Sequence, residues 1–286
     1  MKENAPAKKG LRETIAEMNA MIADKMSKIR FKIPVMSGKG GVGKSFITVN
    51  VAVGLASKGK RVAIFDADFH GPSVAKMLNL VDEIPAISSK GIIPVEGPMG
   101  VKVISLDMLL EEKDAPTIWR GPLKTNVIRQ LLAEVEWGEL DYLLIDLPPG
   151  TGDEPLSIAQ LIPSLTGIIM VTIPSGVSEH VVKKAIVFAE KLKVPIIGIV
   201  ENMSYFECPN CGEVYYLLGK GAGERLTKKY GLRLLGKIPL DPYASLSCDE
   251  GTPIVLKENC DTSRIILEVV DKLINVVEQA GSDRRV

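Results

Sequence analysis

Short apolar runs alternate with helical patterns along the chain after residue 30. The apolar runs have the length of buried strands and occupy residues 31–36, 61–66, 101–106, 142–147, 167–173, 196–200 and 233–238. Between them, apolar residues recur with a helical period at 44–58, 123–135, 178–192, 224–230 and 263–279. Strand-like runs that alternate with helices are typical of βαβ units. The pattern therefore predicts an α/β fold, with a mostly parallel sheet flanked by helices on both faces.

The first 30 residues follow a different pattern. Residues 1–10 are polar, and from Leu11 onward a helical period begins, with apolar residues at Ile15, Met18, Ile22, Met26 and Ile29. One interpretation is a helix docked on the main domain or on a second copy of it; the other is a recruitment arm for a partner or a membrane surface. No linker follows Phe31. We therefore expect a tail with an amphipathic helix over 1–30 and one domain over 31–286.

Composition excludes some classes of function. The 286 residues include 35 Lys+Arg and 35 Asp+Glu, so the net charge is zero and a globally basic nucleic-acid binder is disfavoured. An uncharged stretch over 155–178 has the length of a membrane span, but three prolines interrupt it, and a buried strand with turns is favoured. No secretory signal pattern opens the chain. We expect a cytoplasmic protein with no nucleic-acid or membrane partner, whose cysteines serve metals or redox chemistry.

A glycine-rich segment lies between the predicted strand 31–36 and the predicted helix 44–58. It fits G-x-x-x-x-G-K-[ST] and consists of Gly38, Lys39, Gly40, Gly41, Val42, Gly43, Lys44 and Ser45. Backbone N–H groups of such a loop surround a polyphosphate, and the helix N-terminus adds positive potential. Lys44 is expected to reach the β- and γ-phosphates, and the Ser45 hydroxyl to bind Mg²⁺. A chance glycine-rich turn is the alternative, and the strand–loop–helix context disfavours it.

Carboxylates follow two of the predicted strands. Asp146 ends an apolar run in the Walker B arrangement, where it would lie near Mg²⁺, and Gly150 in the next turn offers an N–H to the γ-phosphate. Asp66 and Asp68 end an earlier strand, at the edge where ligands of open α/β sheets bind. Either one could orient the attacking water. The alternative for this pair is capping of the turn at residues 71–73.

Two of the four cysteines have the spacing of a metal knuckle. Cys208 and Cys211 can bind one metal or one cluster edge, but they are half of a tetrahedral set. Cys248 and Cys260 lack this spacing and are expected to be small buried hydrophobes. A two-fold dimer would supply four thiolates. Zinc held by the same thiolates, a redox dithiol and an inert pair remain alternatives, because ligand type alone does not separate zinc from iron–sulfur.

The second lysine of the glycine loop, Lys39, gives the form GKGGVGKS, which resembles the deviant Walker A motif of the MinD/ArsA/nitrogenase-iron-protein class. This resemblance implies a P-loop NTPase of the SIMIBI type that binds ATP between two subunits, with Lys39 reaching the partner's nucleotide. It implies that Asp68 orients the water, that Asp66 is its metal-side companion, and that Asp146 is the Walker B acid. Asn202 resembles the adenine-reading residue of the class, and the segment with Pro239 and Asp241 resembles the second wall of the base site.

Three longer segments narrow the resemblance. DADFHGPS at 66–73, LLIDLPPGTGD at 143–153 and ECPNCGE at 207–213 resemble the Mrp/ApbC family of iron–sulfur cluster carrier ATPases. The resemblance implies a [4Fe–4S] cluster that bridges the two subunits at Cys208 and Cys211, and transfer of that cluster to apo recipient proteins. The reaction would be in-line attack of water on the γ-phosphate, with Lys44, Mg²⁺ and the partner's Lys39 neutralising charge.

Two other functions stay open at the level of sequence. One is a MinD/ParA-like positioning switch on a membrane or DNA surface, which would favour a basic C-terminal helix, whereas residues 261–279 carry more acidic than basic side chains. The other is a regulatory metal-binding protein that holds ATP statically and recruits partners through its N-terminal helix.

Overall fold

The computed structural model describes residues 11–69, 71–109 and 121–283. In this part of the chain an eight-stranded sheet has the order β12-β9-β8-β1-β7-β2-β6-β5. Neighbouring strands are parallel except β5 and β6, which pair antiparallel at one edge. The strands are β1 (Ile29–Ser37), β2 (Val62–Asp66), β5 (Val95–Glu96), β6 (Lys102–Ser105), β7 (Leu140–Asp146), β8 (Ile168–Thr172), β9 (Ile196–Glu201) and β12 (Leu234–Lys237).

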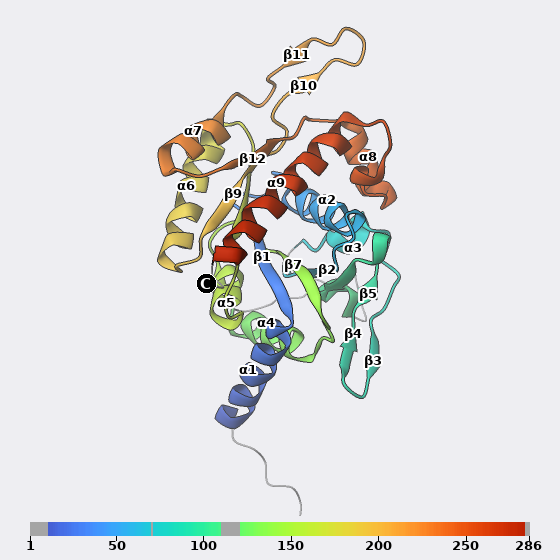
Figure 1. Cartoon of the computed structure of the whole chain (residues 1–286), viewed down its shortest axis with the longest axis vertical. Helices are drawn as coiled ribbons and strands as arrows, with labels where there is room; N and C mark the ends of the chain where they lie inside the picture. The colour runs from blue at the N-terminus through green and yellow to red at the C-terminus, as the bar shows by residue number, and fades with distance from the viewer. Residues whose placement is uncertain (1–10, 70, 110–120, 284–286) are drawn as a thin grey trace, which may run out of the picture.

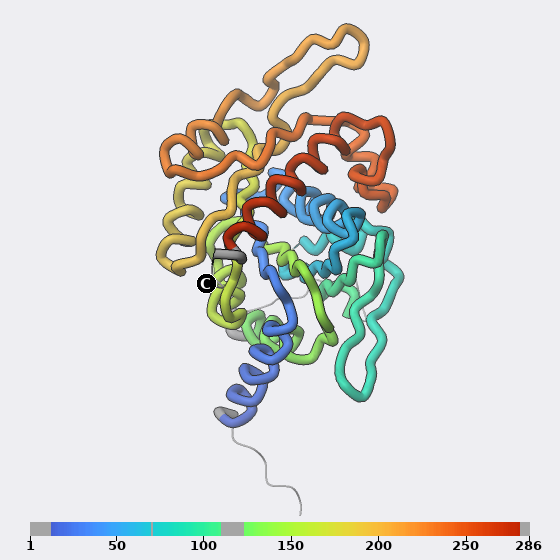
Figure 2. The backbone as a smooth tube through the Cα atoms, in the orientation of Figure 1, coloured from blue at the N-terminus to red at the C-terminus, as the bar shows by residue number. Residues whose placement is uncertain are grey.

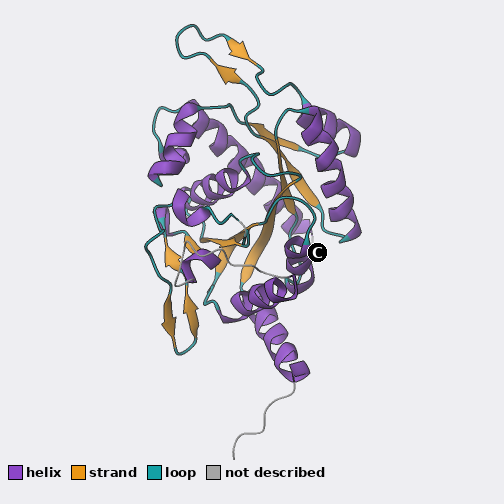
Figure 3. Ribbon diagram, turned by 180° about the vertical axis from the view of Figure 1, so that it is seen from behind, coloured by secondary structure: helices purple, strands orange, loops and turns teal. Residues whose placement is uncertain are grey.

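Helices cover both faces of this sheet, as the alternating pattern predicts (Figure 1, and from behind Figure 3). Each face of the sheet has its own core cluster. Ile33 and Ile64 belong to the first cluster, whereas Met36 and Phe65 belong to the second, on the opposite face. The first cluster lies under α2 (Lys44–Ser57), α3 (Val74–Met77) and α9 (Asp261–Asp283); the second lies under α4 (Gly121–Glu134), α5 (Asp153–Leu161), α6 (Gly176–Lys191) and α7 (Ala222–Tyr230). Strands with apolar side chains on both faces are therefore buried on both sides.

The N-terminal helix α1 (Leu11–Ser27) packs on the body of the same chain. Its Ile22 and Met26 are buried in the second core cluster, and the helix contacts α4. The buried Lys32 donates to the carbonyls of Met26 and Ile29 at 3.2 and 3.0 Å, which ties the end of α1 to β1. The docked helix is thus the interpretation that the structure favours. The polar residues 1–10 lie outside the described residues.

Several short elements have no counterpart in the predicted pattern. They are two hairpins, β3 (Ala86–Ser88) with β4 (Gly91–Ile93) and β10 (Phe206–Glu207) with β11 (Val214–Tyr215), the helices α3, α5 and α8 (Pro242–Glu250), and the 3₁₀ turns η1 (Pro98–Gly100), η2 (Leu106–Leu109) and η3 (Ile254–Leu256). Most of these elements are too short to establish a period. The tube in Figure 2 shows the β10–β11 hairpin and α1 at opposite ends of the molecule.

The uncharged stretch over 155–178 contains the predicted strand β8, but its first part is most of a helix, α5. Pro155 is the third residue of α5, in the first turn, where a missing N–H breaks no helical hydrogen bond. The proline therefore marks the start of a helix here and not an interruption. No helix among the described residues is both long and apolar enough to cross a bilayer.

Candidate nucleotide site and cysteine arm

The strand order brings the predicted phosphate loop and the predicted carboxylates to one edge of the sheet. β1 lies beside β7, and β7 lies beside β2. In register, Val35 of β1 pairs with Asp146, and Asp146 pairs with Asp66. Because these strands are parallel, the loop after β1 and the acids that end β7 and β2 meet at their carboxyl ends.

The loop from Gly38 to Gly43 opens directly into α2, which begins at Lys44. Gly43 has φ 78°, a left-handed conformation that favours glycine, and a Cβ there would overlap the side-chain amide of Asn202. The loop lines a cavity of about 230 Å³, together with Asp68, Met77 and Pro149. The first N–H groups of α2 have no partners inside the helix, so the cavity offers donors and a positive dipole end to an anion.

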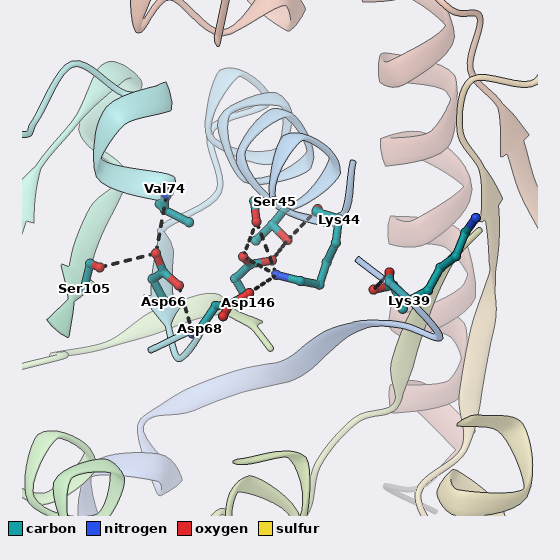
Figure 4. A network of polar contacts seen from close by, with 10 residues as sticks. Lys39, Lys44, Ser45, Asp66, Asp68, Val74, Ser105 and Asp146 are labelled. Atoms are coloured by element: carbon teal, nitrogen blue, oxygen red, sulfur yellow. Dashed lines mark hydrogen bonds and ion pairs between the residues drawn. The ribbon is translucent and has the colours of Figure 1, made fainter. Parts of the chain in front are cut away.

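Lys44 and Ser45, which line this cavity, converge on the carboxylate of Asp146 behind it (Figure 4). The Lys44 Nζ lies 2.5 Å from Oδ2 of Asp146, and the Ser45 hydroxyl donates to the same oxygen at 2.6 Å. The Thr48 hydroxyl donates to the other oxygen, Oδ1, at 2.6 Å. The Asp146 side chain is fully buried. Two hydroxyls and a carboxylate are oxygen ligands of the kind that Mg²⁺ binds, so the donor set fits that ion.

The second pair of acids lies beside this group. Asp68 places Oδ2 3.7 Å from the Lys44 Nζ. Asp66 accepts hydrogen bonds from the backbone N–H of Asp68 at 3.1 Å and of Val74 at 3.4 Å. Burial, followed by the nearby charge of Asp146, raises the pKa of Asp66 to about 8. Asp66 therefore holds the turn that leads into α3, which agrees with the capping alternative, whereas Asp68 lines the cavity.

Lys39 and Gly150 occupy different settings from Lys44. The Lys39 side chain points away from the carboxylates, and among the described residues no acid lies within ion-pair distance of its ammonium (Figure 4). The backbone N–H of Gly150 donates to the carbonyl of Ser37 at 2.8 Å, which holds the turn after β7 against the start of the loop.

The residues predicted to bind the adenine base follow the strands β9 and β12. Asn202 is buried after β9, and its Nδ2 donates to the carbonyl of Val42 in the phosphate loop at 2.9 Å. Asp241 caps α8 by accepting from the N–H of Tyr243 at 2.8 Å, and also accepts from the Thr262 hydroxyl at 2.6 Å. Pro239 lies between two residues that bond to the segment after Asn202. These three residues do not line the 230 Å³ cavity.

The predicted cysteine knuckle lies at the end of the β10–β11 hairpin, which projects from the body (Figure 1). The Cys208 N–H donates to the carbonyl of Glu213, and the Gly212 N–H donates to the carbonyl of Cys208, both at 2.9 Å. The N–H groups of Asn210 and Cys211 donate to the Cys208 sulfur, and these bonds lower the pKa of its thiol. Amide donors toward one sulfur favour the thiolate, the form that binds metals.

The other two cysteines lie elsewhere. Cys248 is in α8 and Cys260 precedes α9; both are half-buried and pack at the edge of a core cluster, and burial raises the pKa of the Cys248 thiol. Both cysteines pack against apolar side chains, as expected, but neither is fully buried. Within residues 11–69, 71–109 and 121–283, no group of three or more His, Cys, Asp and Glu side chains could hold a metal ion.

Thr48 and Ser105 belong to the site but were not predicted from the sequence. Thr48 lies four residues after Lys44 and three after Ser45, so all three share one face of α2, and that spacing could have indicated it. Ser105 donates to Asp66 at 3.3 Å from the end of β6, a contact that only the strand order creates.

Comparison with known proteins decides the family. Residues 28–274 match a family model described as ParA, NUBPL iron-transfer P-loop NTPase. The chain belongs to this family. A protein of Saccharolobus solfataricus named iron-sulfur cluster carrier protein is 50% identical over 267 residues, 93% of this chain and 90% of that protein. A Dictyostelium discoideum protein named cytosolic Fe-S cluster assembly factor NUBP2 homolog is 44% identical over 230 residues, 79% of this chain and 87% of that protein.

Solved structures agree with this family. A nucleotide-binding protein of Archaeoglobus fulgidus in complex with ADP has a TM-score of 0.73 and 45% identity, covering 82% of this chain and 91% of that one. The cell division protein MinD of Aquifex aeolicus has a TM-score of 0.63 at 21% identity, covering 86% of this chain and 97% of that one. The MinD likeness shows the fold alone. The NUBPL-type P-loop fold and the resemblance to iron–sulfur carriers are thus confirmed.

Proposed function

We propose that this iron-transfer family member is a homodimeric Mg²⁺-dependent ATPase that binds a [4Fe–4S] cluster between two copies and transfers it to apoproteins. One observation carries the proposal: the chain joins a phosphate-loop site built around Lys44 and Asp146 to the β10–β11 hairpin, which presents two thiols, Cys208 and Cys211. We call this hairpin, with the three residues that follow it, the arm (residues 206–218). Two identical arms give the four thiolates that a [4Fe–4S] cluster requires. The names of the relatives support an iron–sulfur cargo.

The side chains in and beside the cavity support a hydrolytic step. Lys44 would leave Asp146 to bind the β- and γ-phosphates, and Ser45, Thr48 and Asp146 would hold Mg²⁺, which neutralises phosphate charge. Asp68, which faces the cavity, would accept a hydrogen bond from the water that attacks the γ-phosphorus in line. The bond to the β–γ bridging oxygen then breaks, and ADP and phosphate leave.

Two further groups would complete the site when nucleotide binds. Lys39 points away from its own carboxylates, which suits a role at the partner's phosphates, where it would stabilise charge in the transition state. Gly150 would exchange its bond to Ser37 for one to the γ-phosphate. Asn202, beside the loop, would read the adenine edge, with Pro239 and Asp241 as the second wall.

The remaining assignments concern setting and organisation. We propose a cytoplasmic protein, in line with the Dictyostelium relative named cytosolic, with apo iron–sulfur proteins as recipients and no nucleic-acid or membrane partner. Residues 1–30 would act as a tail with a docked helix, and residues 31–286 as the ATPase domain that carries the arm. Zinc at the arm is the competing cargo, since the same thiolates bind it.

Anaerobic reconstitution with iron and sulfide, followed by metal analysis, tests the proposal. About four irons per dimer and broad absorbance near 400 nm are expected for a cluster bridged by two arms. Cys208→Ser should abolish this iron, whereas Cys248→Ser, at a half-buried cysteine away from the arm, is the matched control and should retain it. Iron retained in Cys208→Ser would reject the bridged cluster, and zinc in its place would identify the competing cargo.

A further inference from the structure

The helices α6 and α7 form one face of the molecule beside the base of the arm. They lie side by side over the second core cluster (Figure 1). Arg225 of α7 donates to Glu179 of α6 at 2.8 Å, and Lys183 lies 3.6 Å from the same carboxylate. Gly219, which follows the arm, lies so close to the start of α6 that a Cβ there would overlap the carbonyl of Pro174. The arm therefore leads directly onto this face.

The α6–α7 face is strongly basic, although the whole chain is neutral. We define the face as residues 176–193 and 220–237, which contain ten Lys and Arg and three Glu, a net charge of +7. The rest of the chain therefore carries −7. Five of the basic side chains are exposed and form neither an ion pair nor a ring contact with another described residue. They are Lys184, Lys191, Lys193, Lys228 and Arg233. Their charge is available to a partner.

Exposed apolar side chains lie among these lysines on α6. Val177, Lys184, Val187 and Lys191 follow one another at intervals of seven, three and four residues, which places them on one side of the helix. Val177 is 70% exposed and Val187 is 42% exposed. Nucleic acids bind such a surface through their phosphates, which gain nothing from valine, whereas protein interfaces combine apolar side chains with a polar rim. The mixture favours a protein partner.

The distance between the face and the thiols indicates which protein that is. Nine residues separate Cys211 from Lys220, so the two lie at most roughly 30 Å apart along an extended chain. About 30 Å is the diameter of a small domain. A protein that approaches the thiols at the tip of the arm can therefore touch the face at the same time.

We propose that the α6–α7 face is the docking surface for the protein that receives the cluster, and that it selects recipients with an acidic surface. This inference rests on the proposed function for the identity of the cargo. It adds the chemistry by which the recipient is recognised. Because the chain as a whole has no net charge, attraction from the face would also orient the recipient toward the side of the molecule that leads to the arm.

Stopped-flow association of the metal-free full chain with a labelled, strongly acidic apo-ferredoxin tests the proposal. Lys184→Glu/Lys228→Glu reverses one unpaired charge on each helix and lowers the net charge of the face from +7 to +3. The association rate constant should fall about tenfold at about 50 mM salt, and the difference should vanish near 0.5 M salt, where charges are screened. Iron content after reconstitution should equal that of the parent, since the arm is unchanged.

The matched control is Lys76→Glu/Lys90→Glu. Both lysines are exposed, and they lie on α3 and in the turn of the β3–β4 hairpin, so the chain gains the same negative charge away from the face. This control should associate like the parent. An equal loss in the control would mean that total charge, and not the face, governs association.

Two other results overturn the inference. If the Lys184→Glu/Lys228→Glu variant associates as fast as the parent, the face does not dock the recipient. If this variant instead loses binding to a DNA duplex at about 0.15 M salt while its association with the apo-ferredoxin is unchanged, the face belongs to a nucleic acid. Four irons per dimer together with face-independent association would reject the docking surface alone, whereas face-dependent association of a chain that takes up no iron would reject the proposed function alone.

Discussion

The buried ion pair between Lys44 and Asp146 allows a quantitative test of the nucleotide-free site. Lys44→Met keeps most of the length of the side chain and removes its charge. The Lys44 side chain is 7% exposed and that of Asp146 is 0% exposed, with 2.5 Å between Nζ and Oδ2. Without the ammonium, the Asp146 carboxylate keeps two hydroxyl donors, Ser45 and Thr48, and no paired cation.

The expected cost follows from that geometry. Removal of one partner of a buried pair costs about 3–5 kcal/mol, because the other charge stays buried and unpaired. The two remaining hydroxyl bonds reduce this cost, so we expect a loss of about 3 kcal/mol in the free energy of unfolding. Asp146→Asn in the Lys44→Met background removes the stranded charge, and the double-mutant cycle should give a coupling of about 2 kcal/mol or more.

Urea unfolding followed by far-UV circular dichroism, without nucleotide and with a chelator, measures these values. The control is Lys237→Met: its Nζ also lies 2.5 Å from a carboxylate, that of Glu224, but the two side chains are 35% and 60% exposed. Such an exposed pair contributes at most about 1 kcal/mol. If Lys44→Met costs no more than Lys237→Met, or if the coupling is near zero, the argument from burial is wrong.

Three further predictions concern the same site. The pKa of Asp66 is raised to about 8 in the folded protein, whereas an unfolded aspartate loses its proton near pH 4. Between these two pH values unfolding therefore releases a proton, and the free energy of unfolding falls as the pH rises. Asp66→Asn should flatten this fall in urea titrations, and an unchanged slope would place the proton elsewhere. Thr48→Val should weaken Mg²⁺-dependent nucleotide binding about tenfold in calorimetry, since it removes one oxygen from Asp146 and the ion; equal affinity would exclude Thr48 from the metal site. Gly43→Ala should abolish nucleotide binding and cost at least about 1 kcal/mol of stability, because φ is 78° and the new Cβ would overlap Asn202; a stable variant that binds nucleotide would contradict this.

The nucleotide site could be predicted because its information is local. The glycine loop needs only a strand before it and a helix after it, and both are visible as periodic apolar positions at 31–36 and 44–58. Asp146 and Asp66 end strands of the same pattern, and parallel strands place such ends together. The apolar pattern does not reveal the order in which those strands lie side by side. It therefore could not indicate that Ser105, at the end of β6, contacts Asp66 at the end of β2.

Contacts between distant segments could not be predicted in the same way. Asn202 lies 160 residues from Val42, and no spacing rule indicates that its amide meets the carbonyl of the phosphate loop. The arm was missed for another reason: β10 and β11 have two residues each, too few to show an alternating pattern. The cysteine spacing identified the tip of the arm, but not its projection from the body.

The end of β9 supports both sites of the chain. Asn202 follows this strand and bonds to the phosphate loop through Val42. Glu201, the residue before it, holds both ends of the arm through Ser204 and Gly223. Asn202 and Glu201 are adjacent in the backbone, and both are buried. The phosphate loop and the base of the cysteine arm are therefore fixed to one short piece of chain, so a shift of either relative to β9 must break a buried hydrogen bond, which makes this support resistant to small displacements.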